Sequence, residues 1–77
     1  MSLPEVLKVT RQKAFLSQEA FAKDLHVSVA TINRWETGKS KPNLQALKSL
    51  KSFCIKNNLP YEDIEAMWFE SSEKGEL

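Results

Sequence analysis

The chain is poor in cysteine, glycine and proline. Among its 77 residues there is one cysteine, Cys54, with two glycines and three prolines. A single cysteine excludes an internal disulfide framework and a zinc site built from several thiolates, and it fits a reducing compartment, so we expect a cytoplasmic location. No apolar run approaches the ~18 residues needed to cross a bilayer, and the N-terminus lacks a basic start followed by an apolar core. We therefore expect neither a secreted nor a membrane-spanning protein.

The chain also has little net charge, +1 in total, but its charges are unevenly distributed. Residues 1–58 contain ten Lys and Arg against four acidic residues, whereas residues 59–77 contain one Lys against six acidic residues. A basic body with an acidic C-terminal segment is expected when one surface meets phosphates and the far end does not. Two ordinary solvated faces are the alternative, and composition does not decide between them.

Hydrophobic residues recur at spacings of three and four, and no stretch shows the alternating pattern of a half-buried strand. The prolines stand at expected helix starts, Ser17 and Ser28 are suited to cap two helices, and Gly38 to end one. The sequence therefore predicts an all-α domain of five helices, over 4–14, 17–25, 28–37, from 43 or 44 to 57, and from 60 onward.

The chain has room for one domain. We place this domain at residues 1–70, followed by a flexible acidic tail, residues 71–77. The fourth predicted helix is expected to supply the centre of the core through a broad apolar stripe made of Leu44, Leu47, Leu50, Phe53 and Cys54.

Residues 18–37 are the most informative segment, because two short helices separated by about three residues have helix-turn-helix spacing. Helices joined so tightly need a small residue where they approach, and Ala22 lies on the inner face. Ile32 and Trp35 are expected to point into the core. The outer face of the second of these helices then carries Ala30, Asn33, Arg34 and Thr37. Such side chains suit a B-DNA major groove, where asparagine reads adenine, arginine reads guanine and small apolar groups contact thymine methyls.

Residues 16–38 contain a recognisable set of motifs in a fixed order: Leu16-Ser-Gln18, Phe21-Ala22, Val27-Ser28, Thr31-Ile32 and Trp35-Glu36-Thr-Gly38. Together these motifs resemble the helix-turn-helix family of Cro and the lambda repressor, over roughly residues 6–57. The resemblance implies a five-helix domain, with its helix-turn-helix in the second and third helices. It also implies binding to duplex DNA, commonly as a dimer on an inverted repeat, and regulation of transcription.

The resemblance further implies roles for single positions. In that family the glutamine matching Gln18 contacts a phosphate, and the arginine matching Arg11 pairs with the glutamate matching Glu36. The positions that face the groove match Ser28, Val29, Ala30, Asn33 and Arg34. The alternative to a base contact for Arg34 is a solvated side chain. For Asn33 the alternative is a contact with a phosphate or with a neighbour on its own helix.

The third predicted helix and the segment after it offer further phosphate contacts, because they are basic and polar and follow the groove-facing residues. The alternative for this segment is a solvated basic loop. The residues concerned are Thr37, Lys39, Ser40, Lys41 and Asn43.

The chain departs from the family where glycine is usual, at Phe15 and His26. His26 lies in the tight turn, where a left-handed residue is usual and a residue other than glycine costs ~1 kcal/mol. Histidine is among the better-tolerated substitutes. His26 and Cys54 are also the only candidates for nucleophilic or metal chemistry, and neither stands in a matching cluster. We therefore expect no enzymatic activity, no metal and no cofactor.

These observations predict a sequence-specific double-stranded DNA-binding protein, a transcriptional repressor with residues 28–37 in the major groove. A small domain gains from a partner subunit. We expect a homodimer formed through Tyr61, Ile64, Met67, Trp68 and Phe69, although Trp68 also suits the core. The alternative function is that of a protein-interaction module, either antitoxin-like or an adaptor, that holds another protein through the acidic fifth helix and tail.

Overall fold

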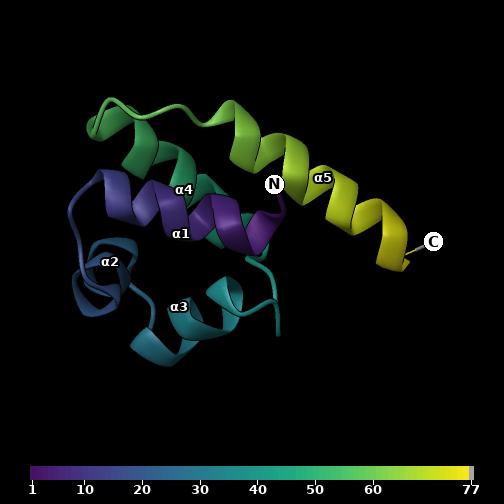
Figure 1. Ribbon diagram of the computed structural model, residues 1–77, viewed down its shortest axis with the longest axis horizontal. Coiled ribbons are helices and arrows are strands. Elements are labelled where there is room, and N and C mark those ends of the chain that lie inside the picture. Colours follow the sequence, from purple (N-terminus) through teal and green to yellow (C-terminus); the bar gives the residue numbers. More distant parts are fainter. Residues whose placement is uncertain (77) are drawn as a thin grey trace.

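Five helices follow one another along the chain (Figure 1). The computed structural model describes the backbone of residues 1–76 and the side chains of residues 1–71, and this part of the chain contains no strand. The predicted all-α class with five helices is confirmed. The helices are α1 (Leu3–Lys13), α2 (Gln18–Leu25), α3 (Val29–Glu36), α4 (Leu44–Lys56) and α5 (Glu62–Glu76).

Serine side chains set the starts of the first three helices. Ser17 and Ser28 cap α2 and α3 as predicted, since each hydroxyl accepts a hydrogen bond from the backbone N–H three residues later. Ser2 caps α1 and forms a capping box with Glu5, whose carboxylate accepts from the Ser2 backbone N–H at 3.0 Å. Because Ser2 and Glu5 satisfy backbone N–H groups of the first turn, α1 begins at Leu3. The sequence predicted a start one residue later, at Pro4.

α4 begins at Leu44, one of the two starts that the sequence predicts, but two other expectations about helix starts and the core are wrong. Pro42 and Pro60 each stand two residues before a helix rather than at its first position, and the side chain of Asn43 caps α4. Leu44, predicted to belong to the apolar stripe of this helix, is 66% exposed. The first turn of α4 directly follows a loop and leaves Leu44 largely in solvent, so the buried stripe begins only at Leu47.

Left-handed residues end α1, α2 and α4. The three residues have φ near +60°, and none is glycine: Phe15, His26 and Asn58. In each case the next residue is apolar, packs against the core and donates its backbone N–H to the carbonyl five residues earlier. This pattern is a Schellman motif, which satisfies helix carbonyls that would otherwise lack partners. The expectation that His26 adopts the left-handed conformation in the turn is confirmed.

Glycine at these three positions is expected to stabilise the domain in a graded way. Phe15 is 95% exposed, so its ring gains little from packing while its backbone bears the left-handed penalty. We expect Phe15→Gly to raise the free energy of unfolding by about 0.5–1 kcal/mol, and the melting temperature by a few degrees. His26→Gly should give a smaller gain, and Asn58→Gly the smallest, because asparagine tolerates this conformation best. Thermal unfolding of the three variants tests this order, and a destabilised Phe15→Gly variant would contradict it.

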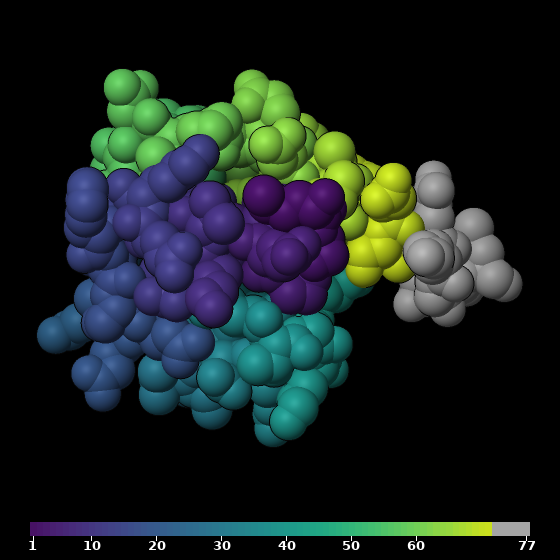
Figure 2. Space-filling view, in the orientation of Figure 1, coloured from purple at the N-terminus to yellow at the C-terminus, as the bar shows by residue number. Residues whose placement is uncertain are grey.

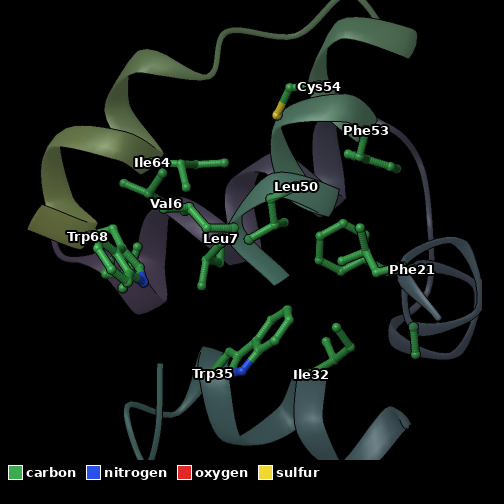
Figure 3. Close-up of a cluster of buried hydrophobic side chains, with 14 residues drawn as sticks. Val6, Leu7, Phe21, Ile32, Trp35, Leu50, Phe53, Cys54, Ile64 and Trp68 are labelled. Atoms are coloured by element: carbon green, nitrogen blue, oxygen red, sulfur yellow. The ribbon is translucent and has the colours of Figure 1, made fainter. Parts of the chain in front are cut away.

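Side chains from all five helices meet in one hydrophobic core (Figure 3). Phe21 of α2 and Phe53 of α4 pack edge to face with ring centroids 5.1 Å apart. Ile32 and Trp35 of α3 are buried in this cluster, as the sequence predicts. One face of α3 is thereby fixed to the rest of the protein, which leaves the opposite face to solvent.

The predicted dimer residues on α5 are not all at the surface. Ile64 and Trp68 are buried in the core of the single chain. The core role considered for Trp68 is therefore confirmed, and the interface role predicted for Ile64 and Trp68 is wrong, because neither side chain is accessible to a second copy. The apolar side of α5 packs within the chain, chiefly against α1. Tyr61 and Met67 are half-buried, and Phe69 is 52% exposed. Of the five predicted residues, Phe69 offers the largest accessible fraction.

The predicted domain boundary at residue 70 falls within α5, which extends to Glu76. The predicted flexibility of residues 71–77 stays a prediction, because the side chains of 72–77 and the backbone of residue 77 lie outside the described residues.

Candidate nucleic-acid interface

Helices α2 and α3 are joined by residues 26–28 and pack closely against each other. Ala22 is buried on the inner face of α2, as predicted, and its carbonyl accepts the Val27 backbone N–H at 3.0 Å. The left-handed His26 turns the chain, and Ser28 then starts α3. The two helices therefore form one rigid helix-turn-helix unit, with α3 at the margin of the molecule and α1 between α3 and α5 (Figure 1).

The outward face of α3 carries the residues that the sequence assigned to base reading. All of them are exposed: Ser28, Val29, Ala30, Asn33 and Arg34. Neither Asn33 nor Arg34 uses its side chain in a hydrogen bond to the side chains or backbone that the structure describes. Their amide and guanidinium groups are thus available to an external partner. The Ser28 hydroxyl instead accepts from the Thr31 backbone N–H at 3.1 Å, so its first role is to cap α3.

A bidentate ion pair fixes the end of α3 to α1. Arg11 donates from Nε to Glu36 Oε2 at 2.7 Å and from Nη2 to Glu36 Oε1 at 2.9 Å. The two side chains are only 12% and 3% exposed, respectively. Arg11 also donates to the Leu16 carbonyl at 2.9 Å, which ties the turn between α1 and α2 to the same group. The structure therefore contains the Arg11–Glu36 pair that the resemblance implied.

Burial alone would raise the pKa of Glu36, because it disfavours the charged carboxylate. Hydrogen bonds from Arg11 and Gln18, together with the positive charges of Arg11 and Lys8, outweigh burial and hold this pKa below its ordinary value. Gln18 donates from Nε2 to Glu36 Oε1 at 3.0 Å. Gln18, which the resemblance predicts to contact a DNA phosphate, is thus already hydrogen-bonded to the Arg11–Glu36 ion pair.

The polar side chains of the loop that follows α3 differ in their exposure to solvent and in their contacts. Lys39 and Ser40 are exposed, whereas the Nζ atom of Lys41 lies 4.3 Å from the centroid of the Trp68 ring and is hidden from solvent. The Asn43 side chain accepts from the Ala46 backbone N–H at 2.9 Å. Sequence reasoning missed the contact to Trp68, because no local pattern connects residues so far apart in the chain.

Thr37 ends α3 with its hydroxyl turned back onto that helix. Its Oγ1 donates to the Asn33 carbonyl at 2.8 Å, and the residue is exposed. Together with Lys39 and Ser40 it forms an accessible polar edge beside the outward face of α3. In the orientation of Figure 2, α3 and this loop occupy the lower margin of the molecule.

Cys54 carries a free thiol that is buried in the core. Burial, with a smaller effect of Glu62, raises the pKa of the Cys54 thiol to about 11, so the buried thiol is protonated at neutral pH. A protonated, buried thiol is a poor nucleophile. No group of three His, Cys, Asp or Glu suited to a metal ion occurs among the described residues.

Comparison with known proteins assigns the family. Residues 7–54, more than half of the chain, match the helix-turn-helix family. The chain belongs to the helix-turn-helix family. This helix-turn-helix chain is 40% identical over 53 residues to the HTH-type transcriptional activator BcrR of Enterococcus faecalis, covering 69% of the chain and 26% of BcrR. It is 40% identical over 48 residues to Antitoxin HigA-2 of Vibrio cholerae, covering 62% of the chain and 46% of HigA-2.

The matched part of the helix-turn-helix chain spans less than half the length of either relative. No solved structure matches it. None of the helices in the described part of the chain is both long enough and apolar enough to cross a membrane. The match over residues 7–54 contains α2, α3 and the whole outward face of α3, and it confirms the resemblance identified from the sequence motifs.

Proposed function

We propose that the protein binds double-stranded DNA at specific sequences and regulates transcription, with α3 inserted into the major groove. The observation that carries this proposal is the division of α3 into two faces. Ile32 and Trp35 fix one face in the core, and the other presents small residues next to the free amide of Asn33 and the free guanidinium of Arg34. One helix fits the major groove, and these two groups suit adenine and guanine edges.

Contacts to phosphates would set the register of α3 in the groove. Lys39 and Ser40 stand beside the end of α3, and Gln18 lies in the first turn of α2, where free backbone N–H groups favour an anion. We propose that Gln18 contacts a phosphate while it remains bonded to Glu36, since its amide nitrogen carries a second N–H. Thr37 and Asn43 would add contacts at the two ends of the loop.

We also propose a homodimer that places two copies of α3 about one helical turn, ~34 Å, apart on DNA. Because Ile64 and Trp68 are buried, we propose that Phe69 and the half-buried Met67 and Tyr61 make the contacts between the two copies.

Repression is the proposed outcome, because a protein bound in the major groove of a promoter blocks access to it. The cytoplasm is the proposed location, since a regulator works where the DNA and a reducing environment for Cys54 are found together.

Selection from a random pool of duplexes tests this function. We expect enrichment of one inverted-repeat site, and an affinity that falls steeply as salt rises, with a slope of about −0.9 for each phosphate contact. Light scattering on the bound complex gives the number of subunits. Equal recovery of all sequences, or no retained duplex at low salt, would contradict sequence-specific binding.

A second candidate function is that of an antitoxin or adaptor that binds another protein. The match to Antitoxin HigA-2 favours it, as does the acidic first turn of α5, which contains Glu62, Asp63 and Glu65. Duplex binding and partner binding occupy different surfaces in this scheme. A stable complex with a co-encoded protein, formed by a chain without measurable duplex affinity, would favour this function over the first.

A further inference from the structure

Trp68 of α5 contacts the loop between α3 and α4 through a hydrogen bond. Its indole Nε1 donates to the carbonyl of Pro42 at 2.6 Å, and the bond is buried. Pro42 is itself fully buried and directly precedes Asn43, the residue that caps α4. The side chain of Trp68 is only 8% exposed and lies at the edge of the core cluster (Figure 3). The indole therefore fixes the end of the loop to α5.

The Trp68 indole also contacts Lys41, the residue before Pro42. The Lys41 ammonium lies 4.3 Å from the ring centroid of Trp68, within the range of a cation–π contact. Its nitrogen is excluded from solvent and has no hydrogen-bond partner among the residues that the structure describes. An ammonium removed from water requires compensation, and the face of the ring supplies it. Two consecutive loop residues are thus attached to one side chain of α5.

The other end of the loop is attached to α3. The backbone N–H groups of Lys39 and Ser40 both donate to the Arg34 carbonyl, at 2.9 and 3.4 Å. Gly38 makes this turn possible with a φ of +80°. The exposed side chains of Lys39 and Ser40 therefore stand between a fixed point on α3 and a fixed point on Trp68.

We propose that Trp68 is a positioning residue of the DNA interface. It does not touch DNA, and it acts by holding the Gly38–Asn43 loop so that Lys39 and Ser40 meet phosphates while α3 lies in the groove. This inference rests on the proposed function. It gives α5 a part in DNA binding within a single chain, separate from any contact between two copies.

Trp68→Phe tests the proposal, because phenylalanine keeps an aromatic ring but has no N–H to donate to Pro42. The matched control is Ile64→Val, which removes one buried methylene from the same helix and leaves the loop untouched. Both variants are titrated with the selected duplex at a temperature at which circular dichroism shows them folded. We expect Trp68→Phe to bind roughly tenfold more weakly, the scale of one lost charge-assisted hydrogen bond. Its salt slope should fall by about 0.9, and Ile64→Val should match the unmodified protein.

A double-mutant cycle with Lys39→Ala separates positioning from a general loss of structure. If the indole acts through Lys39, Trp68→Phe should cost little further affinity once Lys39 is removed. The preferred bases should not change in any of these variants, since α3 reads them. Full additivity of the two losses, or equal affinities and salt slopes for Trp68→Phe and Ile64→Val, would overturn the inference and leave the proposed function standing. Absence of duplex binding by the unmodified protein would remove both.

A measurement on the unmodified protein does not depend on whether a variant folds. Hydrogen exchange of the Trp68 indole N–H, followed by NMR, should be slow in the free protein and remain slow in the complex with DNA. Rapid exchange in the complex would show that the bond to Pro42 is absent when DNA is bound, and would overturn the positioning role.

Discussion

Replacing Glu36 by alanine is expected to lower the free energy of unfolding by about 3 kcal/mol, because it leaves the Arg11 guanidinium nearly buried without its carboxylate. Gln18 loses the acceptor of its amide N–H in the same variant. A domain of this size is stabilised by only about 4–11 kcal/mol in total, so the loss is a large part of the margin. Urea denaturation at neutral pH measures it.

The control for this prediction is Glu70→Ala, which removes an exposed carboxylate from the middle of α5 and should change stability by less than about 0.5 kcal/mol. The double variant Arg11→Ala with Glu36→Ala should be less destabilised than the sum of the single variants, because it leaves no unpaired buried charge. Equal stability of the Glu36→Ala variant and the unmodified protein would show that the ion pair contributes nothing.

The pH dependence of stability gives a second measure of the same pair. The pKa of Glu36 is lower in the folded protein than in the unfolded chain, so folding favours the ionised carboxylate. Its contribution is complete above the ordinary pKa of a glutamate in the unfolded chain and is lost as the pH falls through the lower folded pKa. The free energy of unfolding of the unmodified protein should therefore fall in acid. The part of this fall that comes from Glu36 should be absent in the Glu36→Ala variant, as urea denaturation at a series of pH values would show.

The helical part of the fold follows from local sequence signals. Ser17 and Ser28 are placed to cap helices, and both do so because their hydroxyls have free N–H groups within three residues. The two faces of α3 follow from the spacing of Ile32 and Trp35, since residues three apart lie on one side of a helix. Local signals of this kind also place Asn33 and Arg34 on the outer face.

The parts that sequence reasoning missed depend on contacts between distant segments. An aromatic residue on an amphipathic helix suits the core and an interface equally well, and contacts with distant segments, including α1 and the loop before α4, bury Ile64 and Trp68 within one chain. The bond from Trp68 to Pro42 spans 26 positions. Leu44 has the spacing of a core residue, but it is 66% exposed while Leu47, one turn later, is buried. Periodicity predicts which side of a helix is apolar, and it does not predict what covers that side.

Arg34→Ala is expected to relax the preference at one base position of the selected duplex by about 1–3 kcal/mol, because the exposed guanidinium is the group on α3 that can donate two parallel hydrogen bonds to a guanine. The affinity for the preferred site should fall about 10- to 100-fold, while duplexes changed at that position should lose little. Parallel titrations of the preferred duplex and its single-base variants measure both quantities. The fold should be unaffected, because the Arg34 side chain is exposed and makes no ion pair or hydrogen bond with the residues that the structure describes.

Two matched variants decide what kind of contact Arg34 makes. Arg34→Lys keeps the positive charge and loses the planar pair of donors, so it should behave like Arg34→Ala in base preference while retaining more affinity for all sequences. Lys56→Ala removes an exposed positive charge from the last turn of α4, outside α3 and its adjacent loop, and should weaken binding slightly and equally for every duplex. If Arg34→Ala instead weakens all duplexes by the same factor and lowers the salt slope by about 1, the guanidinium binds a phosphate. Base reading by α3 would then rest on Asn33 and the small residues of its first turn.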